Sequence, residues 1–142
     1  MLDLDEDIIP GVGAAGITIG QSIAALLALG MEEGAEPHLA RHLLTFGPVS
    51  AISAIDDTGV IGWIWLKQGY RGKIAGKIGV GSRIAEVVAT FGPVEYIGIG
   101  EYQLDKGTPW LENDWTFIVE RGSPVEGEPG WEDASIYCIN VS

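Results

Sequence analysis

The stretch IGVGSRIAEVVATFGPV, residues 78–94, decides the fold of this chain. It predicts a short strand, a glycine turn, an amphipathic helix and a defined helix end. Ser82 is the expected N-cap, because its hydroxyl can accept a hydrogen bond from a free backbone N–H of the first turn. Gly92 and Pro93 then end the helix, since glycine tolerates the left-handed conformation and proline cannot continue the ladder. Residues spaced i, i+3, i+4 and i+7 form its apolar face: Ile84, Val87, Val88 and Phe91.

A related stretch, ITIGQSIAALLA at residues 17–28, aligns with residues 78–89 at an offset of 61. It predicts a strand followed by a first helix at about residues 21–30. The identical pairs are Ile17 and Ile78, Gly20 and Gly81, Ile23 and Ile84, Ala24 and Ala85, and Ala28 and Ala89. We interpret this similarity as an internal duplication.

The five residues TFGPV also occur twice, at positions 45–49 and 90–94, an offset of 45. Because this offset is 16 residues smaller than the first, the duplication predicts a helix-sized insert near residues 30–44. The chain of 142 residues is then a single domain built from two repeats, at about 8–68 and 69–142.

Composition indicates a folded domain with a strong negative charge. Hydrophobic residues make up 46% of the chain, there are 21 glycines, and the formal net charge is −12. Such a charge disfavours nucleic acid and anionic membranes as partners and suits a basic protein, although solubility alone is the alternative explanation. Five of the 8 basic residues cluster before and within the second repeat, where we expect them to pair with the chain's own carboxylates: Lys67, Arg71, Lys73, Lys77 and Arg83.

The expected location is the cytoplasm. The acidic N-terminus does not have the basic region of a signal peptide, and the most apolar run, residues 17–29, is interrupted and too short to cross a bilayer. The single cysteine, Cys138, cannot form an internal disulfide. It lies in the apolar run of the last strand, so we expect a buried core thiol.

The sequence predicts no catalytic site, metal or cofactor. Residues 11–16 fit G-x-G-x-x-G, but the β-branched segment that follows them predicts a turn rather than a nucleotide loop. His38 and His42 are four residues apart on an expected second helix at 36–46, without a third metal ligand in the motif. Carboxylate pairs in polar turns do not provide the desolvated group that general acid–base catalysis needs. We therefore expect a binding protein rather than an enzyme.

The expected strands are antiparallel, at about 49–55, 60–66, 94–104, 115–119 and 134–141, with an interruption at 98–100. An Asp-Asp-Thr-Gly hairpin turn joins the first two. Trp63 and Trp65 share one strand face, which belongs either to the core or to a concave binding sheet. The predicted fold class is α+β, with two related units and helices packed on one face of the sheet.

The unit of strand, glycine, helix, Phe-Gly-Pro and antiparallel strands resembles the building block of β-lactamase inhibitor proteins and of small outer-membrane assembly lipoproteins. The inhibitor contains this unit twice. Those families carry Gly-Met-Ser or Gly-Met-Thr at the turn, whereas this chain has GQS at 20–22 and GSR at 81–83, and it does not have the inhibitor's disulfides. The resemblance implies a fold, but it does not transfer a location or a target.

The fuller pattern is IPGVGAAGI at 9–17, an acidic hairpin, GKIAGKIGVG at 72–81 and the final strand IYCINV at 136–141. It resembles small bacterial immunity proteins of polymorphic toxin systems, such as contact-dependent growth inhibition. The resemblance implies that the protein binds and neutralises one cognate toxin domain. A nuclease is one candidate, because a carboxylate-rich inhibitor can mimic the phosphates that a basic cleft binds.

On this hypothesis, carboxylates steer the toxin and Trp110 is a desolvated anchor. The expected partner-binding residues are the acidic turns and their neighbours: Asp56, Asp57, Glu101, Asp105, Trp110, Glu112 and Asp114. The competing site is the strand face with Trp63 and Trp65. Two other functions stay open. One is a small-molecule-binding module that uses the aromatic strands, and the other is an envelope assembly factor, which requires a signal sequence.

Overall fold

The computed structural model describes residues 2–34, 42–54, 57, 59–104 and 115–142. This part of the chain forms two α-helices, a two-stranded sheet and an eight-stranded sheet. The mixed class expected from the sequence is confirmed, and the large sheet dominates it. The elements follow in this order: β1 (Gly13–Ala14), β2 (Ile17–Thr18), α1 (Ile23–Ala28), β3 (Glu32–Glu33), β4 (Leu43–Phe46), β5 (Val49–Ser53), β6 (Ile61–Lys67), α2 (Ile84–Phe91), β7 (Val94–Gly98), β8 (Glu101–Leu104), β9 (Trp115–Val119), the 3₁₀ helix η3 (Trp131–Asp133) and β10 (Ile136–Val141).

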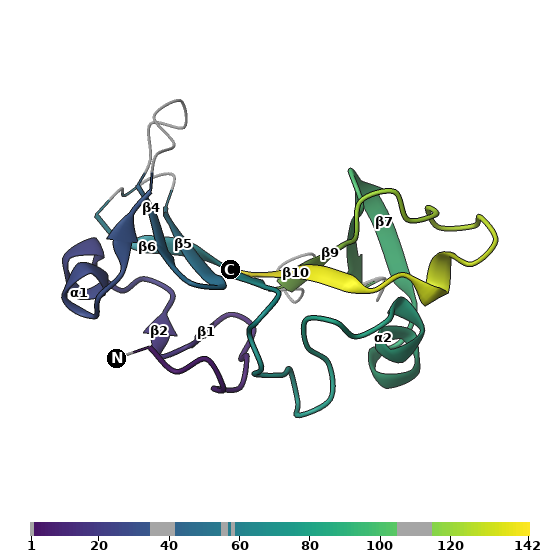
Figure 1. The fold of residues 1–142 in the computed structure, drawn as a ribbon, viewed down its shortest axis with the longest axis horizontal. Helices are drawn as coiled ribbons and strands as arrows, with labels where there is room; N and C mark the ends of the chain where they lie inside the picture. Colours follow the sequence, from purple (N-terminus) through teal and green to yellow (C-terminus); the bar gives the residue numbers. More distant parts are fainter. Residues whose placement is uncertain (1, 35–41, 55–56, 58, 105–114) are drawn as a thin grey trace.

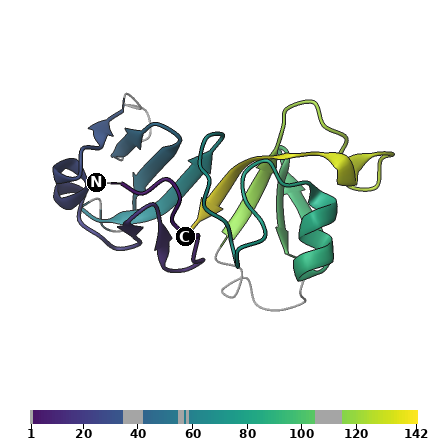
Figure 2. The same cartoon turned by 60° about the horizontal axis from the view of Figure 1, so that its bottom comes forward.

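The large sheet has the strand order β3-β4-β5-β6-β10-β9-β8-β7, and all neighbouring strands are antiparallel. Strands β6 and β10 meet at its centre, with Trp65 opposite Asn140. From each edge strand in to this centre, the strands of each half follow chain order. Helix α1 precedes the first four strands and α2 precedes the last four. Figure 1 shows the halves as two wings joined by β10, and Figure 2 shows the helices at opposite ends of the sheet.

One face of the sheet is buried over most of its strands. Successive strand residues point to opposite faces, so burial alternates along each strand. The ring of Phe91 on α2 packs edge-on against Trp115 of β9 at 5.7 Å, and α1 adds Ile23 and Leu26 to the same core. The buried-face residues are all at most 5% exposed: Leu44, Val49, Ala51, Ile64, Leu66, Val94, Tyr102, Leu104, Trp115, Phe117, Val119, Ile139 and Val141.

The two helices begin with different caps. In α1 the Ser22 hydroxyl accepts the Ala25 N–H at 3.1 Å, as expected for a serine N-cap. In α2 the predicted cap, Ser82, is wrong by one residue. The Ser82 hydroxyl instead accepts the Gly79 N–H at 3.0 Å within the preceding turn, and the helix begins after Arg83. The Glu86 carboxylate accepts the Arg83 N–H at 3.3 Å and completes this start.

The helix predicted at 36–46 is wrong for the residues that the structure describes. Residues 43–46 form β4, which pairs with β3 on one side and β5 on the other. The first TFGPV copy is therefore the end of a strand and a hairpin turn, with no helix end. His42 precedes β4, with its Nδ1 2.5 Å from the Glu33 carboxylate, and His38 lies outside the described residues. Hydrogen bonding along both edges of β4 outweighs the helical spacing of its leucines.

The G-x-G-x-x-G segment forms a turn, as predicted, and the turn belongs to a tight hairpin that the sequence analysis did not predict. Strands β1 and β2 pair across Ala15 (φ 58°) and Gly16 (φ 82°), two left-handed residues of the kind that hairpin turns require. A Cβ at Gly13 would lie 2.0 Å from the Ile17 carbonyl oxygen, so that glycine is needed for close approach. The next helix begins only at Ile23.

Tyr70 ties this N-terminal segment to the rest of the fold. Its hydroxyl accepts the Ala15 N–H at 2.9 Å and donates to the Glu6 carbonyl oxygen at 2.5 Å. Burial of the ring raises the pKa of Tyr70 to about 12. Arg71 next to it forms an ion pair with Asp5.

In the described part of the chain, no helix combines the length and the apolar character that crossing a membrane requires.

Candidate functional site

The second face of the large sheet is open at its centre, and we define it by the strand residues that alternate with the buried set. Residues opposite one another in the ladder share a face. The pairs Trp65–Asn140, Thr116–Asn140 and Glu101–Ile118 therefore place parts of β6, β10, β9 and β8 on one surface. We call this surface the open face. Its half-buried members are Leu43, Thr45, Trp63, Trp65, Lys67, Glu101, Gln103, Thr116, Ile118 and Asn140.

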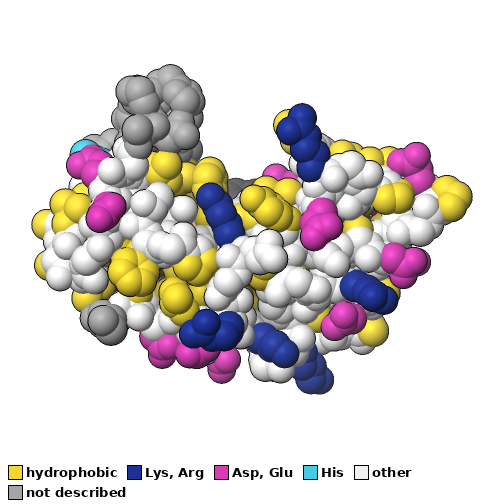
Figure 3. All heavy atoms as spheres, viewed as in Figure 1, with side chains coloured by type: hydrophobic (Ala, Val, Ile, Leu, Met, Phe, Trp, Pro, Cys, Tyr) yellow, Lys and Arg dark blue, Asp and Glu magenta, His cyan; other side chains and the backbone are white. Residues whose placement is uncertain are grey.

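The middle of the open face is an apolar hollow of about 620 Å³. Trp63 and Trp65 of β6 line one side of it, and Ile118 of β9 lines the other. Ile97 and Ile99, at the end of β7 and the turn beyond it, complete the wall and are 44% and 97% exposed. Figure 3 shows hydrophobic side chains gathered in the upper middle of the molecule, where the two wings meet.

A hydrogen-bonded polar cluster lies beside the tryptophans. The Glu101 carboxylate accepts the Thr116 hydroxyl at 2.7 Å and the Asn140 side-chain N–H at 2.9 Å. Asn140 Nδ2 also lies 3.2 Å from the Thr116 hydroxyl oxygen. These bonds hold Glu101 in one orientation within the hollow. A negative charge is therefore fixed next to an apolar surface, which is an arrangement suited to a cationic group with an apolar neighbour.

The thiol of Cys138 lies beside this polar cluster. It donates to the Asn140 side-chain oxygen at 3.5 Å and is 4% exposed. Burial raises the pKa of Cys138 to about 11, so the thiol stays protonated at neutral pH and is a poor nucleophile. This agrees with the expectation of a buried core thiol.

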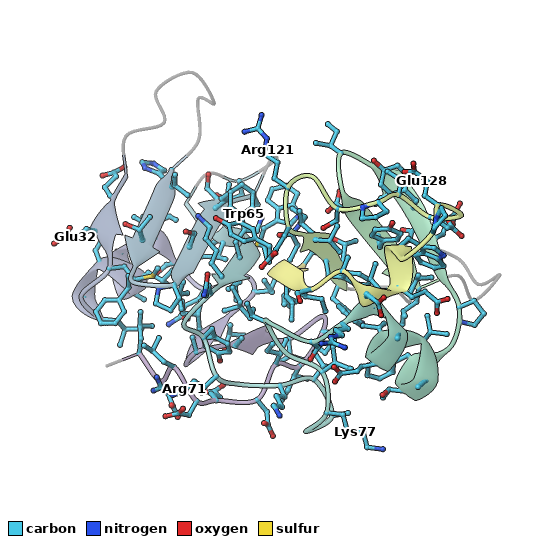
Figure 4. The ribbon with its side chains drawn as sticks, turned by 45° about the vertical axis from the view of Figure 1, so that its right-hand side comes forward. Glu32, Trp65, Arg71, Lys77, Arg121 and Glu128 are labelled. Carbon is cyan, nitrogen blue, oxygen red and sulfur yellow. The ribbon has the colours of Figure 1, made fainter. Side chains whose placement is uncertain are left out.

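Cationic side chains lie at the border of the open face and on the far side of the molecule. The Lys67 ammonium lies 6.0 Å from the centre of the Trp65 ring. Figure 4 shows Trp65 on the sheet with Arg121 beyond it, and Arg71 and Lys77 on the opposite side of the molecule. The basic cluster therefore does not neutralise Glu101 as a group, although Arg71 pairs with Asp5.

Of the seven predicted partner-binding residues, the structure describes two. Glu101 lies on the open face, next to the tryptophans that the sequence named as the competing site. Asp57 lies in the hairpin turn between β5 and β6, where its carboxylate accepts the Gly59 N–H at 3.0 Å. The remaining predicted positions lie outside the described residues: Asp56, Asp105, Trp110, Glu112 and Asp114.

Sequence reasoning missed three residues that line the hollow: Ile99, Ile118 and Asn140. Asn140 carries no signal of its own, since its role depends on the pairing of β10 with β9, which are distant in sequence from β8. Ile99 did carry a signal. A β-branched residue between two glycines, in a turn, is an unusual choice that could have marked the position.

The described residues contain no group of three or more His, Cys, Asp or Glu side chains arranged to hold a metal ion. The open face combines aromatic rings, aliphatic side chains and one oriented carboxylate. Such a surface can bind by desolvation and charge pairing.

No family model matches the chain, and neither a curated protein nor a solved structure matches it.

Proposed function

We propose that this chain is an immunity protein, which neutralises a cognate bacterial toxin domain by direct stoichiometric binding through the open face. The observation that carries the proposal is the pairing of Trp63 and Trp65, half-buried in a broad apolar hollow, with the oriented carboxylate of Glu101. Tryptophan is enriched among the residues that dominate interface energies, especially near the centre of a patch. Binding alone, without a catalytic step, accounts for these features.

The arrangement of the sheet supports a broad protein partner. The buried face is covered from within the chain, whereas the open face presents several strands with their side chains toward a partner. Each half consists of a helix followed by four antiparallel strands. We propose that the halves are two related units whose helices cover the same face. The other face would then extend over both units, giving a surface wide enough for a protein domain.

Charge supports a basic target. The chain has a formal net charge of −12, so a domain with a basic cleft, as in a nuclease toxin, would be attracted over long range and would associate quickly. Nucleic acids and anionic membranes would be repelled. The cytoplasm of the producing cell is the place where such an inhibitor would act.

The first test is binding of the purified protein to the polypeptide encoded by the immediately adjacent gene, measured by calorimetry and by rescue of growth. We expect a 1:1 complex and loss of toxicity. Trp65→Ala should weaken the complex by about thirtyfold or more, the size expected for a central anchor. Leu27→Ala, at a 43% exposed position on α1, is the matched control and should bind as the wild type does.

Salt dependence tests the electrostatic part separately. The association rate should fall steeply between low and high ionic strength, because screening shortens the range of attraction. Glu101→Gln should slow association or speed dissociation, whereas Glu132→Gln, at an exposed position of η3 away from the open face, should change little. A complex whose association rate ignores salt would contradict the basic partner.

The alternative function is a small-molecule-binding module. The observation that favours it is the size of the hollow, about 620 Å³, with a second hollow of about 790 Å³ beside it. Both values lie within the range of known ligand sites. A screen of aromatic and cationic compounds by thermal shift separates the two functions. A ligand that stabilises the protein and is lost in Trp65→Ala, together with no binding to the adjacent gene product, would favour the module.

A further inference from the structure

The turn between β7 and β8 holds an isoleucine in an unfavourable conformation. Gly98, Ile99 and Gly100 all have positive φ, at 117°, 51° and 75°. Glycine adopts such values freely, but a β-branched residue there is a genuine outlier. The Ile99 side chain is 97% exposed and so gains almost nothing from packing within the chain. Both its backbone conformation and its exposure cost free energy that packing among the described residues does not offset.

The surrounding structure holds this turn in place. The Gly100 N–H donates to the Tyr96 hydroxyl at 3.2 Å, and the Gly100 carbonyl oxygen accepts the Val119 N–H at 3.0 Å. The Tyr96 ring packs edge-on against Tyr102 at 5.1 Å. Tyr102 is fully buried and stacks on both Phe117 and Trp131. A strained residue persists only where its surroundings over-determine it, and such residues cluster at functional positions.

Ile99 also belongs to the candidate surface. It lines the hollow beside Trp63 and Trp65, and it lines the second hollow beside Arg121 and Tyr137. It is therefore a ridge between two depressions, with Ile97 (44% exposed) leading up to it. A side chain that projects so far cannot enclose a small ligand, because the concave part of the contact has to come from the partner.

We infer that Ile99 is a second anchor of the proposed interaction, in addition to Trp65, and that it enters an apolar socket on a basic protein partner. The inference rests on the proposed function and adds the residue and the chemistry of its receiving site. Glu101, two residues along, would pair with a cation at the border of that socket. A second copy of this chain does not suit the role, since two proteins of charge −12 repel each other. The braced turn lowers the cost of ordering the anchor on binding.

Stability provides a test that needs no partner. Ile99→Asn removes the apolar side chain and introduces a residue that tolerates positive φ. The midpoint of thermal unfolding should stay unchanged or rise, and Ile99→Gly should behave similarly. A clear fall in the midpoint for both variants would show that Ile99 supports the fold, and it would overturn the inference.

Affinity for the adjacent gene product provides the second test, measured by surface plasmon resonance. Ile99→Asn and Ile99→Ala should weaken binding at least tenfold, mainly through faster dissociation. Ile9→Ala is the matched control, because Ile9 is 51% exposed in the N-terminal segment, and it should bind as the wild type does. If the wild type binds and both Ile99 variants bind equally well, only the anchor is overturned. If the wild type does not bind, the proposed function is overturned and the anchor with it.

Discussion

Residues 45–49 and residues 90–94 have the same sequence, TFGPV, and different structures. In the first copy Thr45 and Phe46 end β4, and Gly47, at φ 56°, turns the chain into β5. In the second copy the same two residue types form the last turn of α2. There Gly92 has φ 112° and ψ −171°, and it leads the chain directly into the edge strand β7.

The difference shows that these five residues mark a change of direction but do not select the element that precedes it. Thr and Phe are acceptable in strands and tolerated in helices. The residues that precede each pentapeptide decide whether a strand or a helix forms. Leu43 and Leu44 pair with Ile52 and Ala51 of β5, whereas Ile84 and Val87 follow a capped start and bury one helical face. Tertiary pairing therefore sets the conformation of the first copy.

Among substitutions in the two pentapeptide copies, those of the phenylalanines should change the free energy of unfolding most. Phe91→Ala should lower the free energy of unfolding by about 3 kcal/mol, because it removes a partly buried ring and its edge contact with Trp115. Phe46→Ala should cost about 2 kcal/mol, since Phe46 packs against the core without a ring partner among the described residues. Urea unfolding measures both. An equal or reversed order would mean that the strand copy is the better packed.

Helices α1 and α2 could be predicted because their signals are local. The spacing of Ile84 and Val87, a nearby cap and the Gly92–Pro93 end all lie within one stretch, and α2 is observed at Ile84–Phe91. The sequence signal for the hairpin of β5 and β6 was equally local. The prediction of a helix at 36–46 was wrong because Leu43–Phe46 form a strand through pairing with β3 and β5 on either side. The spacing of apolar residues along the chain carries no information about such pairing partners.

The candidate site was only partly predictable for the same reason. Trp63 and Trp65 could be placed on one strand face from their spacing alone. The contact of Glu101 with Thr116 and Asn140 depends on three strands that are adjacent in the sheet but distant in the chain. The duplication also loses the support of the repeated pentapeptide, because its two copies occupy different elements. The match of residues 17–28 with 78–89 stays consistent with α1 and α2.

Substitutions of Gly47 and Gly92 should give the next largest change in the free energy of unfolding. A Cβ at Gly47 or Gly92 would meet no atom within 4 Å, so alanine substitutions report on backbone conformation alone. Gly92→Ala should cost about 2 kcal/mol, because φ 112° with ψ −171° is a region that only glycine visits readily. Gly47→Ala should cost about 1 kcal/mol, the usual penalty of the left-handed helical region. Thermal and urea unfolding of the two variants measure these costs, and a larger cost at Gly47 would contradict the difference between the two turns.

The threonines give the smallest effect and the sharpest contrast, because the two changes should differ in sign. Thr90→Ala should raise the free energy of unfolding by about 0.3 kcal/mol, since alanine is the better helix former in the last turn of α2. Thr45→Ala should lower it by about 0.5 kcal/mol, because Thr45 lies between Glu32 and Ser50 in the ladder and loses its cross-strand contacts. The double variant is the control, and its effect should equal the sum, since the two positions are in different elements. Two changes of the same sign, measured by urea unfolding, would show that the identical pentapeptides respond alike and that their surroundings do not decide.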